Sequence, residues 1–229
     1  MNKVVNKYHL LCDGDRIVVG LSGGKDSLTL LFMLSERLKR VQFKYEFFPV
    51  YIDPGFDGSS GVELEEYCLS MGFKLIWERS DFGIQAHSSE NRKNPCFLCS
   101  RLRRKRLFEI ADQLGSTKLA LGHHKDDIIE TLFINMFYSG RIGTMVPNQM
   151  LFNNAFQIIR PLAYVDEADI IKFAKERNFP VFTNPCPSAE SSKRKEIKDL
   201  LNNLYQLNGN IKGNIFRSMS QVNEEYLLT

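Results

Sequence analysis

The order of short apolar runs and amphipathic helical patterns along the 229 residues is the feature that most constrains the fold. Runs rich in branched or aromatic residues predict strands at 15–21, 45–52, 73–78, 118–121 and 156–159. Helical spacing of apolar residues predicts helices at 26–38, 61–71, 99–114, 124–138 and 167–178, with a loop at 80–95. Because strand–helix–strand order places successive strands parallel, the sequence predicts an α/β fold with a parallel twisted sheet and helices on both faces.

The segment after residue 182 departs from this alternation. Asn184-Pro-Cys-Pro187 leads into a charged run, and 208–213 reads as a turn between two terminal helices. We expect one α/β domain over 1–182 and a small helical extension over 183–229 that does not fold independently. The length suits one sizeable core, since single domains commonly reach ~200 residues.

Composition argues against a disordered or membrane-embedded chain. The hydrophobic fraction of 43% and the charged fraction of 25% are ordinary for globular domains. No apolar run approaches the ~20 residues of a membrane helix, and the N-terminal residues lack the hydrophobic stretch of a signal peptide. We therefore expect a cytoplasmic protein with no membrane partner.

A glycine turn joins the first predicted strand to the first long predicted helix, where open parallel sheets bind ligands. The turn consists of Ser22, Gly23, Gly24, Lys25, Asp26 and Ser27. Two glycines allow the backbone to approach an anion, and the helix N-terminus supplies positive potential. A carboxylate at Asp26 beside phosphate suggests a bound Mg²⁺. The Walker spacing is absent, and a plain tight turn with a capping serine is the alternative.

A second polar motif, Gly122-His-His-Lys-Asp-Asp127, follows the predicted strand 118–121 and opens the next helix. By spacing alone, its adjacent carboxylates either cap the helix and offset its dipole, or they face a ligand at the same sheet edge as the glycine turn.

Five cysteines, an odd number, do not indicate a disulfide framework. Cys96 and Cys99 have the spacing of a Zn²⁺ or iron–sulfur ligand pair before a helix, with a redox pair or coincidence as the alternative. Cys186 is the candidate third ligand. Cys12 and Cys68 are expected to be buried apolar thiols.

Basic residues are concentrated locally, although the net charge is only +3. Seven of them lie within 92–106, and a second cluster contains Lys193, Arg194, Lys195 and Lys198. Such clusters suit a polyanionic partner, whereas a solvated helix face is the ordinary alternative.

These motifs resemble known families. Ser22 to Ser27 is similar to the PP-loop of N-type ATP pyrophosphatases, whose fold is the Rossmann-like adenine nucleotide alpha-hydrolase type. Four further stretches resemble the tRNA 2-thiocytidine synthetase family. They are Pro95-Cys-x-x-Cys-Ser-Arg-Leu-Arg-Arg104, Ala120-Leu-Gly-His-His-x-Asp-Asp127, Asn135-Met-Phe-Tyr138 and Arg160-Pro-Leu-Ala-Tyr164.

The resemblance implies site residues. It assigns ATP and pyrophosphate binding to Ser22, Gly23, Gly24, Lys25, Asp26, Ser27, Asp53, His123 and Asp127. It assigns Mg²⁺ to Asp126 and Asp127, and a [4Fe–4S] cluster to Cys96, Cys99 and Cys186. Asp26 and these three cysteines are the implied catalytic residues, and Arg101, Arg103, Arg104 and Lys105 the implied RNA contacts. Many relatives carry a second Cys-x-x-Cys, whereas this chain has Cys186 alone.

The implied reaction adenylates the C2 oxygen of a tRNA pyrimidine, cytidine in the anticodon loop, and replaces it with sulfur. The implied partners are tRNA and a sulfur donor such as a cysteine desulfurase, and a homodimer is compatible with the sequence. Two alternatives remain at this point: a tRNA lysidine-type synthetase, against which the cysteines argue, and a non-catalytic nucleotide-binding module with a structural zinc site.

Overall fold

The computed structural model describes residues 1–92, 94–182, 185–188 and 193–226. Within them, a six-stranded sheet has the order β3-β2-β1-β4-β6-β5. The strands are β1 (Arg16–Leu21), β2 (Glu46–Asp53), β3 (Ile76–Arg79), β4 (Lys118–Leu121), β5 (Asn148–Leu151) and β6 (Phe156–Ile159). Neighbouring strands run parallel except at one edge, where β5 pairs antiparallel with β6. The predicted α/β class with a mainly parallel sheet is confirmed.

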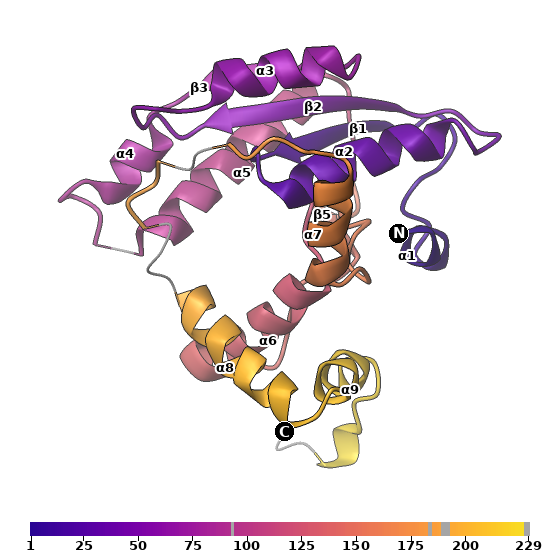
Figure 1. The fold of residues 1–229 in the computed structure, drawn as a ribbon, viewed down its shortest axis with the longest axis vertical. Coiled ribbons are helices and arrows are strands. Elements are labelled where there is room, and N and C mark those ends of the chain that lie inside the picture. Colours follow the sequence, from indigo (N-terminus) through magenta and orange to yellow (C-terminus); the bar gives the residue numbers. More distant parts are fainter. Residues whose placement is uncertain (93, 183–184, 189–192, 227–229) are drawn as a thin grey trace.

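The helices cover both faces of the sheet (Figure 1). They are α1 (Asn2–Lys7), α2 (Lys25–Leu38), α3 (Gly61–Ser70), α4 (Phe82–His87), α5 (Pro95–Gln113), α6 (Lys125–Ser139), α7 (Glu167–Glu176), α8 (Lys193–Leu207) and α9 (Ile211–Ser218), followed by a 3₁₀ turn at Glu224–Tyr226. Alternate residues of β1 face opposite cores, as the two-residue period of a strand requires. Ile17 and Val19 pack with α2 and α3, whereas Val18 packs with α5.

The C-terminal helices share a hydrophobic core with α6, and Figure 1 shows α8 and α9 at the end of the molecule away from α3. Ile197 and Leu201 of α8 are buried against Ile129 of α6. Fully burying such a side chain contributes roughly 1.5–3 kcal/mol, so these contacts anchor α8 on the α/β core. No helix in the described ranges is long and apolar enough to cross a membrane.

Several elements differ from the sequence prediction. The helix expected at 99–114 begins at Pro95, with Asn94 as its N-cap. Cys96, expected before the helix, and Cys99, expected at its start, therefore both lie inside its first turns. The loop expected at 80–95 contains the short helix α4, and the edge strand β5 and helix α1 were not predicted. The expected boundary at residue 183, and Lys93 of the basic cluster, lie outside the described residues.

Candidate active site

Two motifs meet at the carboxyl edge of the sheet because the strands that precede them are adjacent. β1 and β4 pair in parallel with Gly20 opposite Leu121, so the glycine turn and the second motif leave the sheet side by side. A Cβ atom added to Gly122 would lie 3.0 Å from the backbone of Asp26. The second motif therefore packs directly on the first turn of α2.

The glycine turn leaves the N-terminus of α2 accessible. Gly23 has φ +77°, which favours glycine, and Gly24 is an N-cap without a side-chain capping hydrogen bond. The hydroxyls of Ser22 and Ser27 lie 3.3 Å apart, and the Ser22 Oγ accepts from the Gly24 N–H at 3.3 Å. These hydroxyls brace the loop, while N–H groups of the first helical turn remain available to an anion.

A pocket of about 300 Å³ lies between the two motifs and helix α5. Its lining includes Ser22, Asp26 and Ser27 from the glycine turn, Gly122, His123 and Asp127 from the second motif, and Ser100, Arg103 and Arg104 from α5. Three segments that are distant in sequence thus share one cavity, with carboxylates and guanidinium groups on its walls.

The carboxylates predicted to bind Mg²⁺ have different environments. Asp26 lines the pocket, and its buried Oδ1 has the Lys25 ammonium group as an ion-pair partner at 3.1 Å. An oxygen that already faces a cation fits a hard ion such as Mg²⁺. Asp127 also lines the pocket, but its oxygens accept from the His124 N–H at 3.0 Å and from Arg194 at 3.1 Å. The Asp126 carboxylate is outside the pocket lining, 2.6 Å from Lys212. Asp26 and Asp127 are therefore the better placed pair.

His123 and His124 differ in role although they are adjacent. The His123 ring lines the pocket, and its buried Nδ1 has no hydrogen-bond partner. Burial lowers the pKa of His123 to about 4 against the opposing charge of Asp127, and Arg160 and Arg194 add to the lowering. His124, which the sequence analysis did not single out, is the N-cap of α6 and forms a capping box with Asp127. His123 is thus neutral at physiological pH.

The three candidate ligand cysteines come from two segments, and Cys96 and Cys186 are near enough to affect the Cys99 thiol. Burial raises the pKa of the Cys99 thiol against the charge of Arg103, and the nearby Cys186 and Cys96 raise it further. Cys96, Cys99 and Arg103 recur at helical spacing on one face of α5, and Arg103 lines the pocket. The same face of α5 therefore bears the two thiols and, one turn further along, a residue of the pocket wall.

Three thiols fit an iron–sulfur cluster in kind and number. Within the described part of the chain, however, no three His, Cys, Asp or Glu side chains are gathered closely enough to hold a metal ion.

Of the remaining cysteines, Cys68 is buried as expected, with a pKa raised by burial to about 11. Cys12 is exposed, so its predicted burial was wrong: its segment runs along the surface into β1.

The basic run on α5 divides among several faces of the helix. Arg103 and Arg104 line the pocket, while Arg101 and Lys105 are exposed and Lys105 lies 3.7 Å from Glu109. Arg106 forms a bidentate pair with Glu78 of β3, at 2.6 and 2.8 Å, and ties α5 to the sheet. Only part of the cluster is therefore positioned to contact a molecule in the pocket.

Asp53 lies at the end of β2, but its carboxylate is already engaged. Oδ1 accepts from the Gly55 N–H at 2.9 Å and Oδ2 from the Ser59 hydroxyl at 2.6 Å. Gly55 has φ +90°, and a Cβ there would come within 2.2 Å of the Ser80 carbonyl oxygen. Asp53 thus organises the turn after β2 and is not among the residues that line the pocket.

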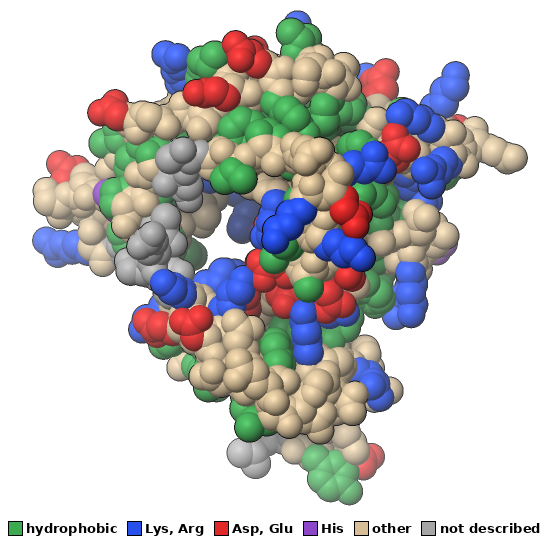
Figure 2. Space-filling model, in the orientation of Figure 1, with side chains coloured by type: hydrophobic (Ala, Val, Ile, Leu, Met, Phe, Trp, Pro, Cys, Tyr) green, Lys and Arg blue, Asp and Glu red, His purple; other side chains and the backbone are tan. Residues whose placement is uncertain are grey.

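Cations from the C-terminal helices reach the edge of this site. Figure 2 shows acidic and basic side chains gathered where α6, α7 and α8 meet. Arg194 donates to Asp127 and to Glu130, Lys198 contacts Glu167, and Lys212 contacts Asp126 and Asp166. Sequence reasoning treated the Lys193–Lys198 cluster as a contact for a polyanionic partner or a solvated helix face, and Glu167 only as a helix start. No local pattern links residues so far apart in sequence.

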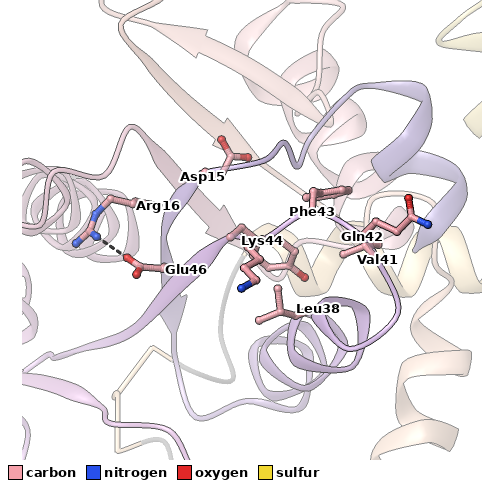
Figure 3. Close-up of a pocket in the computed structure, with 10 residues that line it drawn as sticks. Asp15, Arg16, Leu38, Val41, Gln42, Phe43, Lys44 and Glu46 are labelled. Carbon is pink, nitrogen blue, oxygen red and sulfur yellow. Dashed lines mark hydrogen bonds and ion pairs between the residues drawn. The ribbon is translucent and has the colours of Figure 1, made fainter.

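A larger pocket, of about 600 Å³, lies at the opposite edge of the sheet (Figure 3). Arg16 and Glu46 pair with each other at one end, and Leu38, Val41 and Phe43 provide apolar walls. It contains none of the motif residues. The chemistry suggested by the sequence therefore belongs to the smaller pocket at the carboxyl edge.

Comparison with known proteins agrees with this geometry. The family model described as a PP-loop domain matches residues 1–204. The tRNA-cytidine(32) 2-sulfurtransferase of Geotalea daltonii is 39% identical over the whole chain and 92% of the relative's length. The Saccharophagus degradans protein of that name is 40% identical over 99% of this chain and 74% of the relative.

Among solved structures, the U34-tRNA thiolase of Methanococcus maripaludis with its [4Fe–4S] cluster superposes with a TM-score of 0.80. The match covers 99% of this chain and 78% of the other at 23% identity, which shows a shared fold. An NH₃-dependent NAD synthetase from Campylobacter jejuni has a TM-score of 0.52 at 17% identity, covering 98% and 90% of the two chains. From the sequence matches, this chain belongs to the PP-loop domain family and, within it, to the family of the tRNA-cytidine(32) 2-sulfurtransferases.

Proposed function

We propose that this protein is an ATP-dependent tRNA sulfurtransferase that converts a cytidine of the anticodon loop to 2-thiocytidine. The observation that carries the proposal is the single pocket shared by the glycine turn, the second motif and the face of α5 that bears Cys99. Curated relatives of nearly equal length are named for sulfur transfer to tRNA cytidine 32. A tRNA substrate supports the proposal of a cytoplasmic location.

The activation step uses groups at the glycine turn. The first N–H groups of α2 and Lys25 would hold the ATP phosphates, and Asp26 with Asp127 would hold Mg²⁺. The base leaves its stack to enter the pocket. Its C2 oxygen attacks the α-phosphorus, the bond to the β-phosphate breaks, and pyrophosphate leaves. The positive groups on the pocket wall stabilise charge that develops on the phosphates.

The second step replaces the activated oxygen. A [4Fe–4S] cluster held by Cys96, Cys99 and Cys186 supplies nucleophilic sulfur when bound. Replacement of the activated oxygen would form the C2–S bond and break the C2–O bond, with AMP as the leaving group. Arg103, which lies between the thiols and the pocket, is positioned to contact the RNA phosphates together with Arg104. Arg101 and Lys105 extend this contact over the exposed face of α5.

The same proposal covers the organisation of the chain. Residues 183–229 extend the domain at 1–182 and supply Cys186, and their packing on α6 supports a shared core. A cysteine desulfurase or another sulfur donor reloads the protein after each turnover. A homodimer is compatible with this scheme and is not required by it.

Two variants separate the two steps. Asp26→Ala should abolish ATP-dependent adenylylation and keep the iron, while Cys99→Ser should lose iron and sulfur transfer and keep ATP binding. Cys12→Ser, at an exposed thiol remote from the motifs, is the matched control and should keep both. The measurements are iron and zinc content with the visible spectrum after anaerobic purification, and nucleoside analysis of tRNA.

The outcomes distinguish the proposal from its alternatives. Brown protein with about four irons per chain supports sulfur transfer. Colourless protein with stoichiometric zinc would favour a binding module, and incorporation of lysine into tRNA would favour a lysidine-type synthetase. If both Asp26→Ala and Cys99→Ser still thiolate tRNA, the site assignment is wrong.

A further inference from the structure

The carboxylate of Glu167 lies between a lysine of the glycine turn and a lysine of α8. Its Oε1 is 3.2 Å from Lys25 Nζ, and its Oε2 is 2.6 Å from Lys198 Nζ. The Glu167 side chain is only 17% exposed. The reaction described above gives this glutamate no task, yet it contacts the lysine of the phosphate-binding turn.

A carboxylate beside a phosphate-binding lysine carries an electrostatic cost. Lys25 Nζ also lies 3.1 Å from Asp26 Oδ1, so two negative groups share its charge. Alone, Glu167 would offset the attraction of Lys25 for phosphate and would itself repel the nucleotide. We therefore expect either a positive group that offsets the charge of Glu167, or a role for Glu167 in ATP binding.

Lys198 provides the compensation. One carboxylate between two ammonium groups leaves one net positive charge, the same as a lone lysine. The ammonium groups of Lys198 and Lys25, at 2.6 and 3.2 Å, stabilise the negative charge of the Glu167 carboxylate. Glu167 therefore holds Lys25 in place, and Lys198 offsets the negative charge that Glu167 brings to the site.

Glu167 sits on a well-supported element. It is the first residue of α7, and its backbone N–H donates to Asp126 Oδ2 at 2.8 Å. Helix α7 packs on α2 through the rings of Phe173 and Phe32, whose centroids are 5.5 Å apart. Because α2 begins at Lys25, both residues of the pair start helices that are packed together.

We propose that Glu167 is a positioning residue for Lys25 and that Lys198 of α8 completes the unit, which makes the C-terminal extension part of the ATP site. The inference rests on the proposed function, since it requires ATP at the glycine turn. A lysine oriented before ATP arrives loses less side-chain entropy on binding and meets the phosphates in the productive geometry. The extension then contributes to nucleotide activation as well as supplying Cys186.

The test uses the full-length chain with Glu167→Gln, Lys198→Met and Lys198→Arg, and the double variant Glu167→Gln with Lys198→Met. ATP·Mg²⁺ affinity is measured by equilibrium dialysis without tRNA, and KM for ATP and kcat are measured for adenylylation. Glu167→Gln should raise the Kd and KM about tenfold with a smaller change in kcat. Lys198→Met should also weaken binding, and Lys198→Arg should restore it.

The double variant should bind ATP about as weakly as Glu167→Gln alone, because Lys198 acts through Glu167. Glu176→Gln is the matched control: this glutamate ends the same helix and pairs with Lys172 at 4.0 Å on the exposed face, so ATP affinity should equal that of the wild type. If Glu167→Gln fails to fold, the test uses Lys198→Met instead. The Lys198 side chain is 41% exposed, so its replacement should leave the fold intact.

A lower melting temperature with unchanged ATP affinity would show a purely structural ion pair and overturn the inference. Additive losses in the double variant would also overturn it. A wild-type chain that does not bind ATP would overturn the proposed function and this inference together. A wild type that binds ATP, with variants that bind it equally well, would overturn the inference alone.

Discussion

The N-termini of α2 and α6 lie next to each other at the same sheet edge, but they are built in opposite ways. Helix α2 starts from a glycine N-cap without a side-chain capping bond, after a residue with positive φ. Helix α6 starts from His124, which forms a capping box with Asp127, and has two aspartates in its first turn. One terminus is open to an external group, and the other is satisfied by its own side chains.

The difference teaches how one sheet edge supports two tasks. An open helix N-terminus with glycine backbone attracts an anion, which suits the ATP phosphates. A capped terminus with carboxylates attracts cations, which here come from the C-terminal helices through Arg194 and Lys212. We therefore interpret the N-terminus of α2 as the element that binds the ATP phosphates. The N-terminus of α6 links the C-terminal helices to the site.

The largest expected effect comes from closing the open terminus. Gly23→Val places a branched side chain at φ +77°, where strain costs about 1–3 kcal/mol, and covers the turn near Phe182. ATP affinity measured by equilibrium dialysis should fall at least about a hundredfold. Gly14→Val is the matched control, because Gly14 has φ +76° with nothing within 4 Å of its Cβ position. It should lose stability and keep ATP affinity.

An intermediate effect is expected at the capped terminus. Asp127→Asn keeps an oxygen for the His124 N–H but loses the charge that faces Arg194 and the pocket. The adenylylation rate should fall about tenfold, with a loss of roughly 1 kcal/mol in stability, since the Arg194 side chain is half exposed. Glu130→Gln removes the other Arg194 partner without touching the pocket lining. If both variants lose activity equally, the capped terminus has no separate role at the pocket.

A third effect, on stability rather than on ATP binding or rate, concerns the pH dependence of His123, the residue before the N-cap of α6. His123 has a folded pKa of about 4, below the 6.5 of an unperturbed histidine. As pH falls from 6.5 to 4, His123 becomes protonated in the unfolded chain but stays neutral in the folded chain. The free energy of unfolding therefore decreases through this pH range. This contribution is roughly 3 kcal/mol at pH 4 and should be absent in His123→Gln. Denaturant unfolding at pH 7 and pH 4.5 measures it, and equal losses in both proteins would contradict the assignment.

Much of the fold could be predicted because its signals are local. The strand, glycine turn and helix around Ser22–Ser27 follow from β-branched residues, two glycines and helical spacing within a short stretch. The edge strand β5 was missed since Asn148–Leu151 is short and polar, and it pairs only through a turn with positive φ at Asn153 and Asn154. Helix α5 was placed late because Pro95 at its first position resembles a loop signal.

Within the candidate site, the sequence by itself determined the types of group and the strand ends on which they lie. It identified the glycine turn, the second motif and the cysteine pair, since each is a contiguous pattern with a known local geometry. It could not separate Asp126 from Asp127, because the two differ only in the distant cations and N–H groups that they contact.

Only the tertiary structure decided which groups meet. Cys186 approaches Cys99, and Lys198 reaches Glu167, across segments that no periodicity connects. The physical reason is that ion pairs and thiol proximity depend on how α7 and α8 pack against α2 and α6. That packing is set by buried apolar contacts such as those of Phe173 and Ile197, and it leaves no signature in any short stretch of the chain.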